Sequence, residues 1–145
     1  MKKAVYILGM VLIIGLGACS SDNDNEEGYN MNDIVGKWEG YKWADLTIDP
    51  NTGEILSENQ YVIKNINGLD STWVEVFYND GTHQYIDEGG DVPRSKYEVI
   101  DKTLYLYNSR VKLHIDELTP RSMKLRTTYE LPRGVYVQLI YRKLE

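Results

Sequence analysis

The stretch Val111-Lys112-Leu113-His114-Ile115 decides the fold class of this chain of 145 residues. On an extended backbone its three apolar side chains fall on one side, and Lys112 and His114 fall on the other. The same alternation returns in Met123–Tyr129 and in Val135–Leu144. A period of two predicts strands of an antiparallel sheet, with one face on a core and the other in water.

Short turns divide the remaining strands. Asn79-Asp80-Gly81 separates Ser71–Tyr78 from Thr82–Ile86, and this order predicts a hairpin. A single strand that is apolar on both faces is expected over Tyr97–Tyr107, after a loop over 87–95. Composition places further turns at Asp49–Gly53, Asn67-Gly68, Asn108-Ser109, Thr119–Ser122 and Pro132–Gly134.

No long segment has a helical period, and only Met31–Val35 suggests a helical turn, capped by Asn32 or Asp33. About eight strands joined by short turns predict an all-β protein. The expected architecture is an antiparallel up-and-down barrel, which removes sheet edges by closure.

Several short motifs carry a family resemblance that extends over about Ile34 to Leu144. Gly36-x-Trp38 after a short turn resembles the G-x-W signature of the lipocalins. Other segments are similar to the bacterial lipocalin-like lipoproteins: Phe77–Thr82, Tyr97–Val99, Leu104–Leu106 and Ile115–Thr119. The resemblance implies a lipocalin-like barrel with a short N-terminal helical turn.

The resemblance also implies a structural signature around Trp38, which would close one end of the barrel beneath a basic residue from the last strand. Arg142 is the expected partner, because a guanidinium stacks well on an indole ring. Lys143 is the alternative if the register shifts by one residue. Trp38 and Trp43 are five positions apart, so they lie on opposite faces unless a bulge intervenes.

The N-terminus has a different character. Two basic residues and an apolar run precede Leu16-Gly17-Ala18-Cys19, which resembles the lipobox of bacterial lipoproteins. The run is too short for an ordinary membrane span, which needs about 20 residues. The resemblance implies a signal peptide over 1–18 and attachment of acyl chains such as palmitate to Cys19. A lipidated, disordered acidic tether over 19–32 and a barrel domain over 33–145 would follow.

The acidic run after Cys19 has two interpretations. It resembles the export signal of surface-displayed lipoproteins of certain Gram-negative gut bacteria, and it also suits a solvated spacer. The expected location is therefore the outer membrane of a Gram-negative bacterium, and the export interpretation adds exposure at the cell surface.

Composition excludes several classes of function. A net charge of −6 disfavours nucleic acid, because binding to phosphates rests on basic residues. Cys19 is the only cysteine, so no disulfide and no cysteine-based metal site is expected. His83 and His114 are interpreted as surface histidines without metal-ligand spacing. We therefore expect a protein that is not an enzyme and has no catalytic residue, metal or cofactor.

Two function classes remain open. An eight-stranded barrel either fills with side chains or holds one small ligand. The first possibility is a binding module for a small, largely apolar ligand, with contact residues unknown. The second is an interaction subunit with a closed core that docks to a protein or glycan through outer tyrosines. The tyrosines singled out for this role are Tyr105, Tyr107, Tyr129 and Tyr136.

Overall fold

A computed structural model describes residues 28–65, 67–87 and 89–144. One short helix, α1 (Met31–Ile34), precedes the strands. The strands are β1 (Gly36–Ile48), β2 (Ile55–Val62), β3 (Trp73–Phe77), β4 (Thr82–Asp87), β5 (Gly90–Asp91), β6 (Ser95–Ile100), β7 (Thr103–Leu106), β8 (Val111–Leu118), β9 (Ser122–Thr127) and β10 (Tyr136–Leu144).

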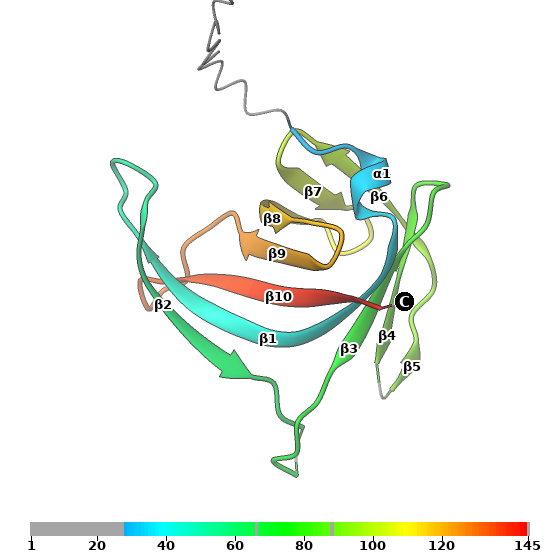
Figure 1. Cartoon of the computed structure of the whole chain (residues 1–145), viewed down its shortest axis with the longest axis horizontal. Helices are drawn as coiled ribbons and strands as arrows, with labels where there is room; N and C mark the ends of the chain where they lie inside the picture. Colours follow the sequence, from blue (N-terminus) through cyan, green and yellow to red (C-terminus); the bar gives the residue numbers. More distant parts are fainter. Residues whose placement is uncertain (1–27, 66, 88, 145) are drawn as a thin grey trace, which may run out of the picture.

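Eight of these strands close into a ring (Figure 1). Strands β3, β4, β6, β7, β8, β9 and β10 follow one another as antiparallel neighbours, and β1 joins β3 to β10. The expected all-β, antiparallel up-and-down arrangement with a short N-terminal helix is confirmed. Strands β2 and β5 lie outside the ring.

Strand β1 is long enough to have two partners on one side. Its first part, Gly36–Gly40, pairs with β3, whereas Lys42–Ile48 pairs with β2. The second part of β1 therefore lies between β10 and β2, and we call residues 42–62 the β1–β2 arm (Figure 1). The expected turn at Asp49–Gly53 joins its two strands, and Gly53 takes a left-handed φ of 75° there.

A bulge resolves the relation of the two tryptophans on β1. The register against β10 shifts between Gly40 and Lys42. Trp43 consequently lies opposite Leu139, which packs against the ring interior that also contains Trp38. Both indoles thus belong to one face of the sheet, as the bulge alternative predicted.

The core fills the end of the ring next to α1. Alternation along each strand sends large side chains inward, and several of them are completely buried. The buried core contains Ile34, Trp38, Phe77, Tyr97, Val99, Leu104, Leu113, Ile115, Met123, Leu125 and Tyr141. A smaller apolar cluster of Ala44, Leu46 and Ile140 lies on the β1–β2 arm and the adjoining part of β10.

The hairpin around Asn79-Asp80-Gly81 is confirmed, because β3 and β4 pair on either side of it. The single strand expected over Tyr97–Tyr107 is wrong, because β6 and β7 are separate antiparallel neighbours. The chain reverses at Asp101, whose φ of 54° is one that aspartate tolerates in tight turns. The expected loop over 87–95 contains the two-residue strand β5.

Contacts with the barrel already begin at Tyr29, before residue 33. The amide of Tyr29 donates to the carbonyl of Asp101 at 2.8 Å, and its side chain packs against the core. Asn30 caps α1, and Asp33 accepts from the Asn30 amide in return. The cap of α1 is therefore Asn30, and not Asn32 or Asp33 as expected.

Candidate ligand-binding site

One end of the ring is filled by side chains, and the other end contains a cavity. Helix α1 and Trp38 occupy one end, whereas a cavity of about 290 Å3 lies at the other, where β3 and β6 begin. Both polar and apolar side chains line this cavity: Glu75, His83, Tyr85, Val92, Pro93, Ser95, Leu106, Asn108 and Ser109. The protein thus has a hollow at the ring end remote from α1.

Glu75 and His83 form a buried polar pair in the wall of this cavity. They lie on the two strands of the Asn79-Asp80-Gly81 hairpin, and each residue is only 8% exposed. His83 Nε2 contacts Glu75 Oε2, and the imidazole stacks on the Phe77 ring with centroids 5.1 Å apart. Each group is costly to bury alone, so each supplies the partner that makes burial of the other tolerable.

The interpretation of His83 as a surface histidine is therefore wrong. The tight turn allows β4 to begin at Thr82, and the next side chain then points inward. Its register partner Phe77 belongs to the core, so alternation places the imidazole inside the ring.

Two tyrosines, Tyr85 and Tyr141, lie close enough to the Glu75 carboxylate for its charge to act on their pKa values. Burial raises the pKa of Tyr141 well above its ordinary value, and the charge of Glu75 acts in the same direction. Burial also raises the pKa of Tyr85, followed by the charge of Asp87. Both phenols remain protonated at neutral pH and retain a hydroxyl that can donate a hydrogen bond.

Tyr85 separates this cavity from a second hollow of about 250 Å3. The second hollow is lined by Ile63, Ser71, Thr72, Trp73, Tyr85, Asp87 and Gly89. Among the described residues that line it, the ionisable groups are the carboxyl of Asp87 and the phenol of Tyr85. Among the described residues that line the two hollows there is no lysine or arginine, so the field at this end of the ring favours neutral or positively charged groups.

Ser95 adds a hydroxyl on the other side of the imidazole. Its Oγ lies 3.5 Å from His83 Nδ1. The hydroxyl and the imidazole thus present two polar groups side by side at the cavity wall.

The closed end contains the expected tryptophan, with a different basic partner. Trp38 is completely buried, and its indole Nε1 donates to the carbonyl of Ile34 at 2.8 Å. The ammonium of Lys143 lies 4.4 Å from the ring centroid and donates to the carbonyl of Val35 at 2.6 Å. Gly36 has a φ of 136°, which residues with a side chain rarely adopt, and this explains the glycine there.

Arg142 is therefore not the partner of Trp38. Trp38 lies opposite Lys143 in the β1–β10 register, whereas Arg142 lies opposite Glu39 on the outer face. The Arg142 guanidinium pairs with Glu39 and lies 5.0 Å from the ring centroid of Tyr41. The observed partner of Trp38 is therefore Lys143, the alternative expected for a register shifted by one residue.

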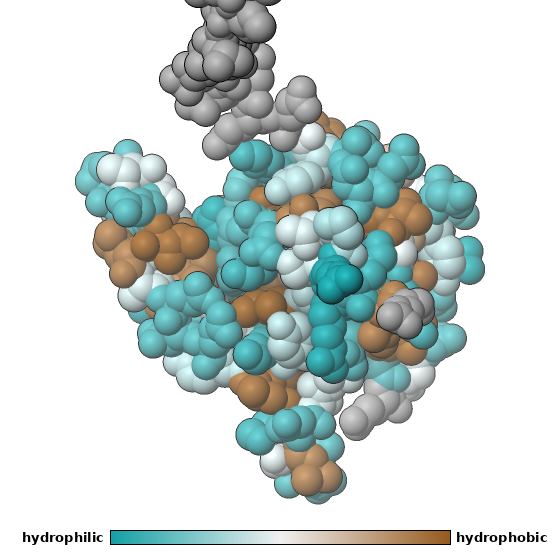
Figure 2. All heavy atoms as spheres, in the orientation of Figure 1, coloured by the Kyte–Doolittle hydropathy of each residue, from teal (hydrophilic) through white to brown (hydrophobic). Residues whose placement is uncertain are grey.

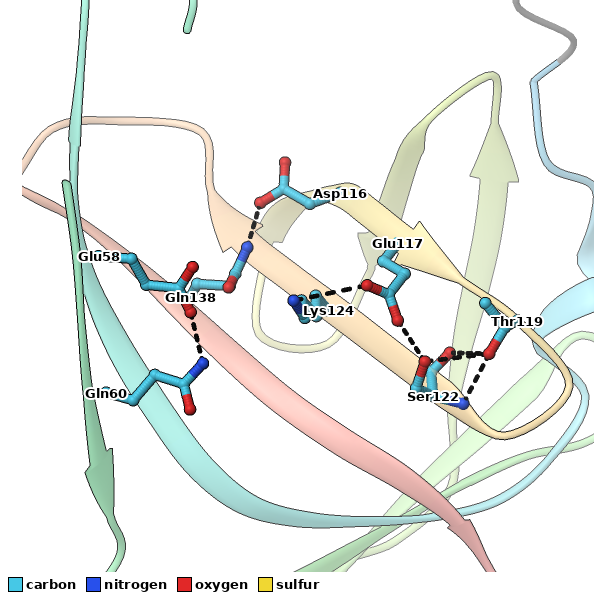
Figure 3. A network of polar contacts seen from close by, with 8 residues as sticks. All are labelled: Glu58, Gln60, Asp116, Glu117, Thr119, Ser122, Lys124 and Gln138. Atoms are coloured by element: carbon cyan, nitrogen blue, oxygen red, sulfur yellow. Dashed lines mark hydrogen bonds and ion pairs between the residues drawn. The ribbon is translucent and has the colours of Figure 1, made fainter. Parts of the chain in front are cut away.

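His114 belongs to a polar network on the outside of the ring. Its Nε2 lies 3.7 Å from Asp116, which also accepts hydrogen bonds from Arg126 and from Gln138. Figure 3 shows Gln138 reaching Asp116, and Ser122 reaching Glu117 farther along β8. These contacts connect β8, β9 and β10 across their outer faces, and they lie away from the two hollows.

The other residues singled out from the sequence are dispersed. Cys19 lies outside the described residues. Tyr105 and Tyr107 border a shallow hollow of about 190 Å3, and lysine ammonium groups lie near both rings. Tyr129 is 62% exposed, and Tyr136 lies beneath the guanidinium of Arg126. The four tyrosines therefore form no continuous surface.

No group of three or more His, Cys, Asp or Glu side chains in the described part of the chain is arranged to hold a metal ion. In residues 28–65, 67–87 and 89–144 no helix has the length and apolar character required to span a membrane. The chain matches no protein-family model, and a search of curated proteins finds no match.

Proposed function

We propose that this protein is a non-catalytic binding module that takes a small, largely apolar ligand into the open end of its barrel. The observation that supports this function best is the cavity of about 290 Å3 with the buried Glu75–His83 pair in its wall. Apolar walls with a few convergent polar groups are typical of small-molecule sites. Val92, Pro93 and Leu106 supply the apolar part of this wall.

The charges around the cavity restrict the polar end of the ligand. A carboxylate entering beside Glu75 would meet a like charge, with no lysine or arginine among the described lining residues to neutralise it. A hydroxyl or an ammonium could donate to Glu75, or to the hydroxyl oxygens of Tyr85 and Ser95. The ligand therefore has an apolar body and a neutral or positively charged head, which disfavours fatty-acid anions.

The lipobox-like segment gives the module its location. Acylation at Cys19 would anchor the protein in the outer membrane of a Gram-negative bacterium, and the acidic tether would hold the barrel off the bilayer. Each buried CH2 contributes about 0.8 kcal/mol, and stable anchoring needs more than one chain. The resemblance to surface-export signals favours display on the cell surface.

Three probes with the same six-carbon chain test the head-group preference: hexylamine, hexan-1-ol and hexanoate. We expect saturation-transfer NMR on the full chain to detect the amine and the alcohol and to give no signal for hexanoate. Leu106→Trp should abolish both signals by filling the cavity. Ile100→Trp is the matched control, because that residue is exposed at the other end of β6.

Preferential binding of hexanoate would contradict the proposed ligand class. Unchanged binding of the amine and the alcohol by a folded Leu106→Trp protein would contradict the proposed site.

The anchor has an independent test. We expect Cys19→Ala to eliminate incorporation of labelled palmitate and to leave the precursor unprocessed, because Cys19 is the only cysteine. Cys19→Ser serves as a matched control that keeps a small polar side chain and should behave like the alanine variant. Labelled fatty acid on the Cys19→Ala protein would refute the lipoprotein assignment without affecting the cavity.

A further inference from the structure

Strand β2 is an uncovered edge of the sheet. It pairs with β1 along one side, and no other strand among the described residues pairs with it. All of its residues are exposed, from Ile55 to Val62. Figure 1 shows β2 on the outer side of β1, running from the tip of the β1–β2 arm back toward β3. Its outer N–H and C=O groups therefore form a template for another extended strand.

This edge has little of the usual protection against pairing. Proteins commonly protect an exposed edge with lysine, proline or a bulge, or by keeping the strand short. Strand β2 has neither lysine nor proline, and its only charge is Glu58. Its pairing with β1 is irregular only at Leu56, and Ser57–Val62 forms a regular edge. Its ends carry exposed apolar side chains, including Leu56 at 61% and Val62 at 45%. Brown spheres cover part of this arm in Figure 2.

The strand is complementary to itself in one register. A two-fold axis perpendicular to a sheet keeps each residue on its own face, so one residue must lie opposite its own copy. With Asn59 on the axis, Glu58 lies opposite Gln60 of the second copy. Ser57 then lies opposite Tyr61, and Val62 meets the segment around the irregularity at Leu56. Each carboxylate meets an amide donor.

Neighbouring registers are poorer. With Glu58 on the axis, the two carboxylates would lie opposite each other, which is destabilising. With Gln60 on the axis, Glu58 would lie opposite Val62. In the present structure Gln60 Nε2 already donates to Glu58 Oε1 at 2.6 Å, which places the two side chains on one face (Figure 3). The second amide hydrogen is available for the carboxylate of a partner copy.

We propose that two copies of this chain form a symmetric dimer by antiparallel pairing of β2 with β2, with Asn59 on the two-fold axis. The sheet then continues from β10 through β1 and β2 into the second copy. The β1–β2 arm projects beyond the ring, so the two rings lie apart and both cavities stay accessible. The dimer does not depend on the proposed ligand.

Charge reversal in the pairing register tests the dimer. Sedimentation velocity on the full chain in detergent should give a concentration-dependent dimer. Gln60→Glu should raise the dissociation constant of the dimer by about tenfold or more. The new carboxylate lies opposite Glu58 of the other copy, and the two-fold axis produces this repulsion twice. Asn51→Glu adds the same charge in the exposed turn of the arm and should leave the dimer unchanged. The Asn51→Glu variant keeps the same lipid anchor, so it also controls for two chains that share one detergent micelle without pairing.

A mixing experiment tests the register itself. Gln60→Glu has acidic residues at 58 and 60, and Glu58→Lys/Gln60→Lys has basic residues at both. Each should be mainly monomeric alone, and an equimolar mixture should form a heterodimer. The proposal would be overturned if the parent protein were monomeric, or if Gln60→Glu formed a dimer of unchanged strength. It would also be overturned if the mixture formed no heterodimer. A monomer that pairs only with an added extended peptide would overturn it as well.

Discussion

Replacing Trp38 with alanine should lower the free energy of unfolding by about 3–5 kcal/mol, the range for deleting a large buried aromatic side chain. The ring is completely buried against α1, and its indole N–H holds the carbonyl of Ile34. A domain of this size has only about 5–15 kcal/mol in total. Chemical denaturation at neutral pH measures the loss, and Trp38→Phe provides a milder variant that retains most of the apolar contact.

Lys143 should be coupled energetically to Trp38. Lys143→Met should cost about 1–2 kcal/mol, because it removes the cation over the ring and the hydrogen bond to Val35. In a double-mutant cycle the two losses should not add, because the side chains touch. Arg142→Met is the matched control on the outer face and should be additive with Trp38→Ala. Additive losses for Lys143, or coupling to Arg142 instead, would contradict this arrangement.

The second large effect concerns the buried Glu75–His83 pair. His83→Leu should cost about 3–5 kcal/mol, because it leaves a buried carboxylate without its partner. Glu75→Leu should cost less, about 1–3 kcal/mol, the range for leaving a buried hydrogen-bonding group without its partner. The double variant should be more stable than His83→Leu alone, because two apolar side chains of similar size replace both polar groups.

That double variant separates stability from function. It should fold and retain the cavity, but it should lose its preference for hexylamine over hexanoate. A double variant that is less stable than His83→Leu would contradict the pairing described here. A stable double variant with an unchanged head-group preference would mean that the Glu75–His83 pair has a structural role only and does not contact the ligand.

The barrel could be predicted from the sequence because the pattern of an alternating strand followed by a short turn occurs several times along the chain. Alternation in Val111–Ile115 and a tight turn at Asn79-Asp80-Gly81 are local patterns, and the backbone follows them. The division of Tyr97–Tyr107 was missed because both faces are apolar there and an Asp-Lys turn is a weak signal. Likewise, β2 has no clear alternation because neither of its faces packs against a core.

The candidate site was harder to predict because it depends on register. Arg142 and Lys143 differ by one position, and only the pairing of β1 with β10 decides which of them lies over Trp38. The polar pair left one usable signal. Glu75 alternates with Trp73 and Phe77, so a carboxylate shares the inner face with two large aromatic residues. Such a residue needs a buried partner, and the hairpin register brings His83 beside it.

Binding of a ligand head group beside Glu75 and His83 can be measured directly, because the chain has two histidines in different surroundings. In a 1H–15N NMR spectrum of the imidazole groups, His83 reports on the cavity and His114 reports on the outer face. Added hexylamine should shift the His83 resonances in a saturable manner and leave those of His114 unchanged. Unchanged His83 resonances, or equal shifts at both histidines, would contradict the proposed site.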